Sequence, residues 1–572
     1  MLKERFFRLF ISTNPISNIQ KLLFLSILLT SFFLFTSLYH LEPGGYLFIE
    51  YANALAFGKD HLTPNVSVRD IGYPLLLWMS GYPYHQSLIG IALINAIMAM
   101  LIPPLIYLIT RPVLPKGSYY IALATIFSLS PFYYIKWIHH DHPYIFFTVL
   151  SLFFLCTFID KKKSTYLYAM TFTVIIASLI RPAGNLFFIF FIATAFIFVR
   201  GSLLRYMICC IIAVLSLTIY TYHRHDFFDQ YKPLQTYNGG QLFYNLYLNS
   251  TRYGITLSPE LGPNMKKITD SLYQSTIKLE ETSQYEKFLK LYVYPYNTNE
   301  FIKRVYTFPA RYYLEMLYRF TKNDQTFMKA SLEIIQKYPW YPFAYTARNS
   351  WYLLYKPGYA HTKYDINLFG KSNIQDAYPF DSKDELELTS LSDRALRELD
   401  FDNFEHKPHI AFTLIHYVKS IFCKCYLFFT KLMFYLMTIS WIAVFLKFGG
   451  RFFLNDKWKN LIELTLANKL DTYITVLTLY LFQSILMVAA LVDPILRFHN
   501  HLIPFKIILA SFGLVILIRL IKSSSHQTNL VTDTMVENII FSKRQKIISI
   551  FLLLLATVLL ISWSEYIIVN TK

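Results

Sequence analysis

The stretch from Leu22 to Leu41 reads LLFLSILLTSFFLFTSLYHL and contains no Lys, Arg, Asp or Glu. A run of this length and composition is about what an α-helix needs to cross the ~30 Å hydrocarbon core of a bilayer. The preceding segment, Met1 to Lys21, is basic and semi-polar, and no small-residue cleavage site follows the run. We therefore interpret Leu22–Leu41 as a membrane span and not as a cleavable signal peptide.

Similar apolar runs recur along the chain, and together they predict an all-α, polytopic transmembrane protein with about 11 spans. The fifth and sixth runs are short, and they form either two spans or one re-entrant pair. The runs cover residues 22–41, 87–109, 119–138, 142–159, 165–180, 185–199, 203–222, 426–446, 472–492, 502–521 and 547–569.

The overall composition agrees with this interpretation. Of the 572 residues, 54% are apolar, and 51 Phe and 45 Tyr are more aromatic side chains than a water-soluble chain usually carries. The formal net charge of +18 would suggest nucleic acid as the partner of a soluble protein. Here the basic residues flank the apolar runs, so we expect them to set the membrane topology and contact anionic lipid, and we expect no nucleic-acid partner.

The distribution of Lys and Arg predicts a cytoplasmic N-terminus, because the positively charged connections then alternate with poorly charged ones. The expected location is a cell membrane, either an inner or a plasma membrane, with the long polar region outside the cytoplasm. The basic residues assigned to the cytoplasmic side are Lys3, Arg5, Arg8, Lys21, Arg111, Lys116, Lys161 to Lys163, Arg200, Arg205, Lys447, Arg451, Lys457, Lys459, Lys469, Lys522, Lys543, Arg544 and Lys546.

Three parts of the chain follow from this topology. Residues 1–222 form an N-terminal transmembrane module with a first outside loop at 42–86, residues 223–425 form a mainly helical extracytoplasmic region, and residues 426–572 hold the C-terminal transmembrane helices. The apolar spacing of Tyr46–Phe57 predicts an amphipathic helix on the membrane surface. In the long region, Phe301–Phe320 and Thr326–Lys337 are expected to be helical, and the Pro-rich stretch Tyr338–Pro342 to interrupt the helix.

Cysteine usage excludes two classes of structural site. Cys156, Cys209, Cys210, Cys423 and Cys425 all lie in or beside apolar runs, so a disulfide scaffold outside the cell is not expected. The pair Cys423 and Cys425 has no second cysteine pair with which to bind zinc.

Charged residues beside the outer ends of the spans are the candidates for function, because a charge is costly there. Glu42 follows the first span directly, where the alternative is an ordinary carboxylate in the interface. The turn Arg69–Pro74 contains Tyr73 between Gly and Pro, which would hold the phenol rigidly against a ligand. Taken alone, the turn is more typical of a simple loop-to-helix connection. Arg181 and Arg497 are suited to phosphate, although each could also be a snorkelling interface residue.

The sequence His139-His140-Asp141-His142-Pro143 lies between the third and fourth spans. Three histidines and a carboxylate suggest metal, but neighbouring residues of one chain rarely direct their side chains at one ion. The segment is better interpreted as polar interface residues around one important carboxylate, Asp141.

Taken in order, these residues resemble those of the C-type (GT-C) glycosyltransferases, in the bacterial branch related to protein O-mannosyltransferases and aminoarabinose transferases. The resemblance covers about residues 20–260 and, less closely, 490–520. It is carried by an acid after the first span, a loop that ends in Arg-x-x-Gly-Tyr-Pro and a second acid that opens the fourth span. An Arg-Pro-x-Gly motif and a late Arg-aromatic pair complete the pattern. In this chain they are Glu42 with Pro43, Tyr46 and Gly58; Arg69 to Pro74; Asp141 after Ser130-Pro131; Arg181 to Gly184; and Arg497-Phe498 before Pro504.

The resemblance implies transfer of a hexose or pentose, with inversion, from a polyprenyl-phosphate donor to an extracytoplasmic acceptor. The acceptor is a lipid, a glycan or a protein of the cell envelope. It implies that Glu42 and Asp141 are the catalytic acids, that Arg69, Arg181 and Arg497 bind the phosphate with help from His142, and that Tyr73 lines the sugar site. Asp is usual at the first acid, so Glu50 is the alternative to Glu42.

A metal and other functions stay open at the level of sequence. Some members of the family use a divalent ion, Mg²⁺ or Mn²⁺, but two carboxylates cannot complete the shell of either ion. The alternatives to a transferase are a polymerase or ligase of lipid-linked sugars, a transporter or flippase of such lipids, and a non-catalytic relative. A transporter is disfavoured because the middles of the spans are nearly free of charge.

Overall fold

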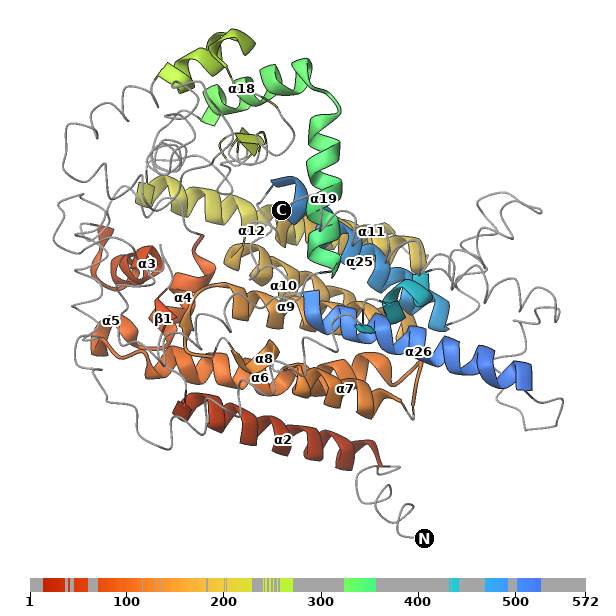
Figure 1. Ribbon diagram of the computed structural model, residues 1–572. Coiled ribbons are helices and arrows are strands. Elements are labelled where there is room, and N and C mark those ends of the chain that lie inside the picture. Colours follow the sequence, from red (N-terminus) through yellow and green to blue (C-terminus); the bar gives the residue numbers. More distant parts are fainter. Residues whose placement is uncertain are drawn as a thin grey trace, which may run out of the picture.

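The computed structural model of the chain is mainly helical (Figure 1), as predicted. Among the residues that the structure describes, four helices are long and apolar enough to cross a membrane: α2 (Pro15–Thr36), α6 (Ile89–Thr110), α9 (Asp141–Lys161) and α12 (Leu203–Phe228). The structure describes residues 14–36, 40–41, 46–59, 70–115, 117–128, 130–133, 135–181, 184–199, 201, 203–228, single positions and pairs between 240 and 255, 258–270, 324–355, 432–433, 435–441, 469–491 and 502–525.

The predicted count of about 11 spans is not confirmed. Further apolar helices accompany the four long ones, namely α10 (Ser164–Ile180), α11 (Gly184–Phe198), α25 (Lys469–Leu491) and α26 (Ile503–Ser525). The prediction of one continuous helix across residues 119–138 is wrong. The segment forms α7 (Ser118–Phe127), the short α8 (Ser130–Tyr133) and a strand. Pro131 explains the break, because a proline has no N–H to continue the α7 ladder.

Helix α9 lies at the centre of the bundle, between α6 and α10. Val149, Leu152 and Leu155 on α9 are fully buried, and they share one apolar core with side chains of α10, α11, α25 and α26. With 21 residues at ~1.5 Å rise per residue, α9 is long enough to span the apolar part of a bilayer. Its first residue is Asp141, so the candidate carboxylate lies at one end of the bundle.

Two short strands tie distant parts of the chain together at that end. Strand β1 (His40–Leu41) runs parallel to β2 (Trp137–Ile138), with His40 opposite Trp137 and Leu41 opposite Ile138. The stretch just after α2 is thereby held beside the stretch that leads into α9.

Three helices of the first loop gather at the same end (Figure 1): α3 (Tyr46–Phe57), α4 (Gly72–Met79) and α5 (Tyr82–His85). The predicted helix at Tyr46–Phe57 is confirmed with those bounds. Its inner face packs on α4, and Leu47, Phe48 and Tyr51 are buried.

The long region between α12 and α25 contributes α18 (Asp324–Lys337) and α19 (Tyr341–Tyr355). They separate at Pro339, as the sequence predicts, and the segment 301–320 lies outside the described residues. Helix α19 packs against α25, and its Leu353 joins the apolar core of the bundle. The Lys506 Nζ of α26 donates to the Leu353 carbonyl, which ties the long region to the bundle.

Candidate functional site

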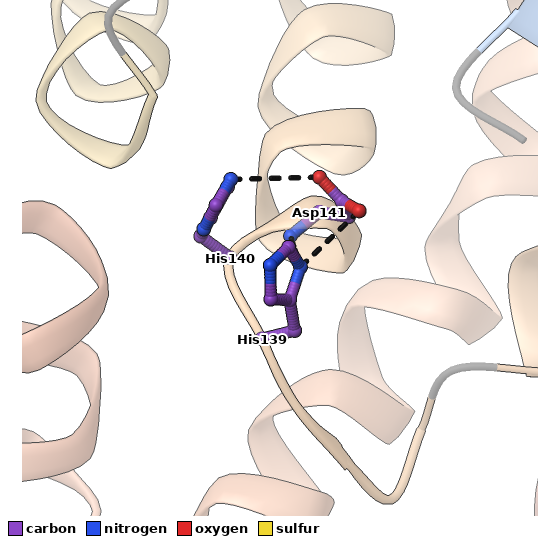
Figure 2. A group of neighbouring side chains, drawn as sticks. All are labelled: His139, His140 and Asp141. Carbon is purple, nitrogen blue, oxygen red and sulfur yellow. Dashed lines mark hydrogen bonds and ion pairs between the residues drawn. The ribbon is translucent and has the colours of Figure 1, made fainter. Parts of the chain in front are cut away.

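A buried carboxylate with three nitrogen-bearing neighbours forms the centre of the site. The Arg181 Nη1 lies 3.0 Å from the Asp141 Oδ1, and the His140 Nε2 lies 3.6 Å from the same oxygen. The His139 Nδ1 is 3.1 Å from the other oxygen, Oδ2. Figure 2 shows the two imidazoles reaching the carboxylate from different sides, each toward its own oxygen. Asp141 is 6% exposed, so these contacts replace most of its water.

The local chain path explains why three consecutive side chains meet. Strand β2 ends at Ile138, the backbone bends at His139 and His140, and α9 begins at Asp141. The carboxylate thus lies in the first turn of α9, where unpaired N–H groups and the helix dipole favour negative charge. The Asp141 N–H also approaches the His139 Nδ1 at 3.3 Å. A protonated Nδ1 donates to the carboxylate, whereas an unprotonated one accepts this N–H.

Arg181 reaches Asp141 from the end of the neighbouring helix. It follows α10 in an extended conformation, and its guanidinium lies 5.4 Å from the centre of the Tyr144 ring, within the range of a cation–π contact. The start of α4 packs against the same point. A Cβ on Gly72 would come within 2.6 Å of the backbone of Leu179 and Ile180, so only glycine allows this approach.

An aromatic wall lies beside the two histidines. The centre of the Phe48 ring on α3 is 6.0 Å from that of His139 and 5.3 Å from that of His140. The Phe48 ring also meets the Tyr73 ring edge-on, with 5.0 Å between the ring centres. The Tyr73 hydroxyl donates to the Trp137 carbonyl at 3.4 Å. Burial raises the pKa of Tyr73 well above its ordinary value, so the phenol stays protonated and acts as a hydrogen-bond donor.

His142 is also buried, but it faces a different neighbour. Its Nε2 lies 2.9 Å from the backbone carbonyl of Asn95 on α6, and a carbonyl only accepts, so Nε2 carries a proton committed to Asn95. The resemblance predicts that His142 helps bind phosphate. This Nε2 proton is engaged elsewhere, while Nδ1 has no hydrogen-bond partner among the described residues.

Asn95 is a site residue that sequence reasoning missed. Its side chain is 1% exposed, and its Nδ2 donates to the Ile135 carbonyl at 3.1 Å, just before β2. Asn95 therefore fixes both the loop before the histidines and His142 behind them. The signal was present, because an amide inside an otherwise apolar span is costly unless it has a partner.

Three of these side chains could together hold a metal ion. His139, His140 and Asp141 each offer one possible ligand atom, and these three atoms lie within 4.8 Å of one another. These neighbouring side chains therefore lie close together, which the sequence did not predict. Two imidazoles and a carboxylate fit Zn²⁺ and similar transition-metal ions, whereas Mg²⁺ prefers oxygen ligands. Of the expected ions, Mg²⁺ thus fits these three residues poorly.

The remaining predicted residues lie outside the described part of the chain: Glu42, Arg69 and Arg497. Leu41, the residue before Glu42, pairs with Ile138, the residue before His139. Glu50, the alternative first acid, lies on α3 between the buried Ile49 and Tyr51. The structure thus brings Asp141, Arg181 and Tyr73 together. His142 follows Asp141 directly but faces α6.

No family model matches the chain, and neither the curated proteins nor the solved structures provide a significant match. The residues of the site themselves therefore carry the functional conclusion.

Proposed function

We propose that the chain is a membrane glycosyltransferase of the GT-C type. It transfers a hexosyl or pentosyl group from a polyprenyl-phosphate donor to a lipid, glycan or protein acceptor on the extracytoplasmic face of a cell membrane. The observation that carries the proposal is the buried pair of Asp141 and Arg181, at the end of an apolar helix of membrane-spanning length.

The location of this pair suits a lipid-linked donor. The polyprenyl tail of such a donor stays among the acyl chains, so its phosphate and sugar lie at the level of the lipid headgroups. A helix that crosses the bilayer presents its first turn at that level. Asp141 is in the first turn of α9, and Arg181 directly follows α10. In this arrangement the charged groups would lie at the depth of the reacting bond.

In the proposed reaction the Asp141 carboxylate orients the acceptor hydroxyl and takes its proton. The acceptor oxygen forms a bond to the anomeric carbon while the bond from that carbon to the phosphate oxygen breaks. The electron pair of the broken bond leaves with the polyprenyl phosphate. Attack opposite the leaving group inverts the anomeric configuration.

Arg181 would stabilise the leaving phosphate. A guanidinium carries five N–H donors in a planar fork, so it can bond a carboxylate through one nitrogen and a phosphate through another. Charge that develops on a leaving group is best stabilised by a donor that is already in position. Arg69 and Arg497 are proposed as further phosphate ligands, and Glu42 as the second acid, from the order of the sequence motifs.

The neighbours of the pair have supporting roles in this scheme. Tyr73 and Phe48 are buried against each other beside the two histidines, and Tyr73 is proposed to line the sugar site from there. His142 anchors the start of α9 to α6 through Asn95. A transition-metal ion held by His139, His140 and Asp141 would supply Lewis acidity, and the scheme above does not require it.

A comparison of strains tests the proposal. Envelope extracts of a deletion strain and its parent are analysed for sugars on lipopolysaccharide, wall polymer and glycoprotein. The expected result is the loss of one sugar, which returns with the wild-type gene and not with Asp141→Asn. An unchanged sugar profile, together with accumulation of a lipid-linked polymer precursor, would favour a polymerase or ligase. A lipid-linked sugar trapped on the cytoplasmic side would favour a flippase.

A further inference from the structure

A second buried cluster lies beside the candidate site, where the end of α12 meets the first loop. It contains Asp70, Tyr220 and Arg224, which are 4%, 4% and 1% exposed. Tyr220 and Arg224 are one helical turn apart on α12, so they share a face. Asp70 comes from the chain directly before α4. None of these residues takes part in the proposed reaction.

The Tyr220 hydroxyl is the hub of the cluster. Its O–H donates to the Asp70 Oδ1 at 3.0 Å, and its oxygen accepts the Ile71 N–H at 3.3 Å and the Arg224 Nη1–H at 3.4 Å. One oxygen thus uses its donor and both of its acceptor positions. The direct approach of the Arg224 Nη1 to the Asp70 Oδ1 is longer, 3.9 Å, so Tyr220 mediates most of their contact.

The hub holds the start of the helix that borders the site. Ile71 is followed by Gly72, whose backbone packs against Leu179 and Ile180 next to Arg181, and then by Tyr73. A shift of α4 would therefore move Tyr73 and loosen the backbone beside Arg181.

A second bond from α12 supports the neighbouring helix. The Tyr51 hydroxyl of α3 lies 3.0 Å from the His223 Nε2. Phe48, which touches both site histidines, is one turn earlier on α3. The end of α12 thus holds both helices that form the aromatic wall.

We propose that Tyr220 is a positioning residue, whose hydroxyl sets the place of α4 against α9 and α10 and thereby of Tyr73 in the site. The effect on sugar transfer rests on the proposed function, whereas the effect on the place of α4 does not. Tyr220→Phe keeps the aromatic ring but removes the hydroxyl that contacts Asp70, Ile71 and Arg224. Tyr222→Phe is the matched control, since Tyr222 is on the same helix but 73% exposed.

The test measures the place of α4 directly. The native cysteines are first replaced by alanine. Spin labels are then attached to Met79→Cys on α4 and Leu215→Cys on α12, at positions that are 64% and 56% exposed. Their distance distribution is measured by pulsed electron paramagnetic resonance on folded, monodisperse protein in nanodiscs. We expect a single narrow distance in the parent and in Tyr222→Phe, and a broad or shifted distribution in Tyr220→Phe.

The same variants are tested in the deletion strain, with the returned sugar normalised to the amount of folded protein. A misplacement of about 1 Å at a site can cost up to ~100-fold in rate, so Tyr220→Phe should lower transfer at least tenfold while Tyr222→Phe leaves it within twofold. An unchanged distance in Tyr220→Phe, or unchanged transfer with a changed distance, would overturn the proposal. If the parent protein itself transfers no sugar, the proposed function fails while the distance still decides whether Tyr220 sets α4.

Asp70→Asn separates the hydroxyl from the ion pair and covers the case in which Tyr220→Phe does not fold. The amide oxygen of asparagine still accepts from the Tyr220 hydroxyl, but the charge opposite Arg224 is lost. The parent distance is expected. A broad distribution in Asp70→Asn would mean that the ion pair holds α4, and it would overturn the proposed role of the hydroxyl.

Discussion

Helix α9 carries an aspartate near each end, and the two ends differ in kind. Asp141 is in the first turn, buried, and in contact with Arg181 and two histidines. Asp160 is in the last turn with a side chain 25% exposed, and its partner is the Lys469 Nζ of α25, whose side chain is 47% exposed. Both are ion pairs between neighbouring helices, but only the first has lost most of its water.

This difference separates a site from a surface contact. Exposed ion pairs stabilise a fold by only ~0–1 kcal/mol, because water competes for both charges. A buried pair is costly to assemble, and removing one partner leaves an uncompensated charge. A protein that keeps the buried pair at one end of α9 is therefore expected to use it, while the pair at the other end serves the packing of α9 on α25.

The largest effect is expected when Asp141 loses its cationic partner, Arg181. Arg181→Met leaves Asp141 buried without its guanidinium, which typically costs ~3–5 kcal/mol, and it should also lower transfer by about 100-fold or more. Lys469→Met is the matched change at the exposed pair. Thermal unfolding in nanodiscs and the returned sugar are the measurements. Equal effects of the two variants would contradict the division between the ends of α9.

The metal preference of the histidine end gives the next effect. Zn²⁺ should raise the unfolding temperature of the purified protein more than Mg²⁺ at the same concentration, because two of the three candidate ligands are imidazoles. The difference should vanish when His139 and His140 are both replaced by alanine. Stabilisation by Mg²⁺ that equals that by Zn²⁺ would show that these three side chains are not the ligands.

A smaller effect is expected at the aromatic wall. Tyr73→Phe removes one long hydrogen bond to Trp137, and such bonds contribute ~1 kcal/mol. Because burial raises the pKa of Tyr73, the phenol is neutral throughout the physiological range, and the pH profile of transfer should be the same in Tyr73→Phe and wild type below about pH 10. Tyr84→Phe, at a tyrosine 58% exposed on α5, is the control. A profile that changes between pH 6 and 9 only in Tyr73→Phe would assign a titrating role to this phenol.

The smallest effect belongs to Lys469→Met considered alone. Loss of an exposed pair should change stability by less than ~1 kcal/mol, and transfer should not change measurably. A large loss of transfer in this variant would show that the end of α9 near Asp160 also takes part in the reaction.

Local patterns predicted local structure well and long-range contacts poorly. The apolar period placed α3 at Tyr46–Phe57, and Pro339 correctly separated α18 from α19. The span at 119–138 failed because its mean hydropathy suggested one helix, while Pro131 broke the backbone ladder.

The candidate site shows the same division. The chemistry of Asp141 and Arg181 marks both as candidates from the sequence, and the two side chains do meet. The convergence of His139, His140 and Asp141 depends on a bend between β2 and α9 that no pattern in the sequence specifies. Asn95 and Tyr220 were missed because their partners lie far along the chain; Tyr220 and Asp70 are 150 residues apart. Such pairs are set by the packing of helices and not by the sequence around either residue.

The most direct test of the account compares Asp141→Asn with Asp160→Asn, two identical changes on one helix. Membranes that contain each variant in equal amount are supplied with lipid-linked donor isolated from the deletion strain, and sugar transfer is measured. Loss of a positioned proton acceptor costs about 100-fold to 10,000-fold, so we predict transfer at or below 1/100 of the wild-type rate in Asp141→Asn and within twofold of it in Asp160→Asn. Wild-type transfer by folded Asp141→Asn would contradict the account.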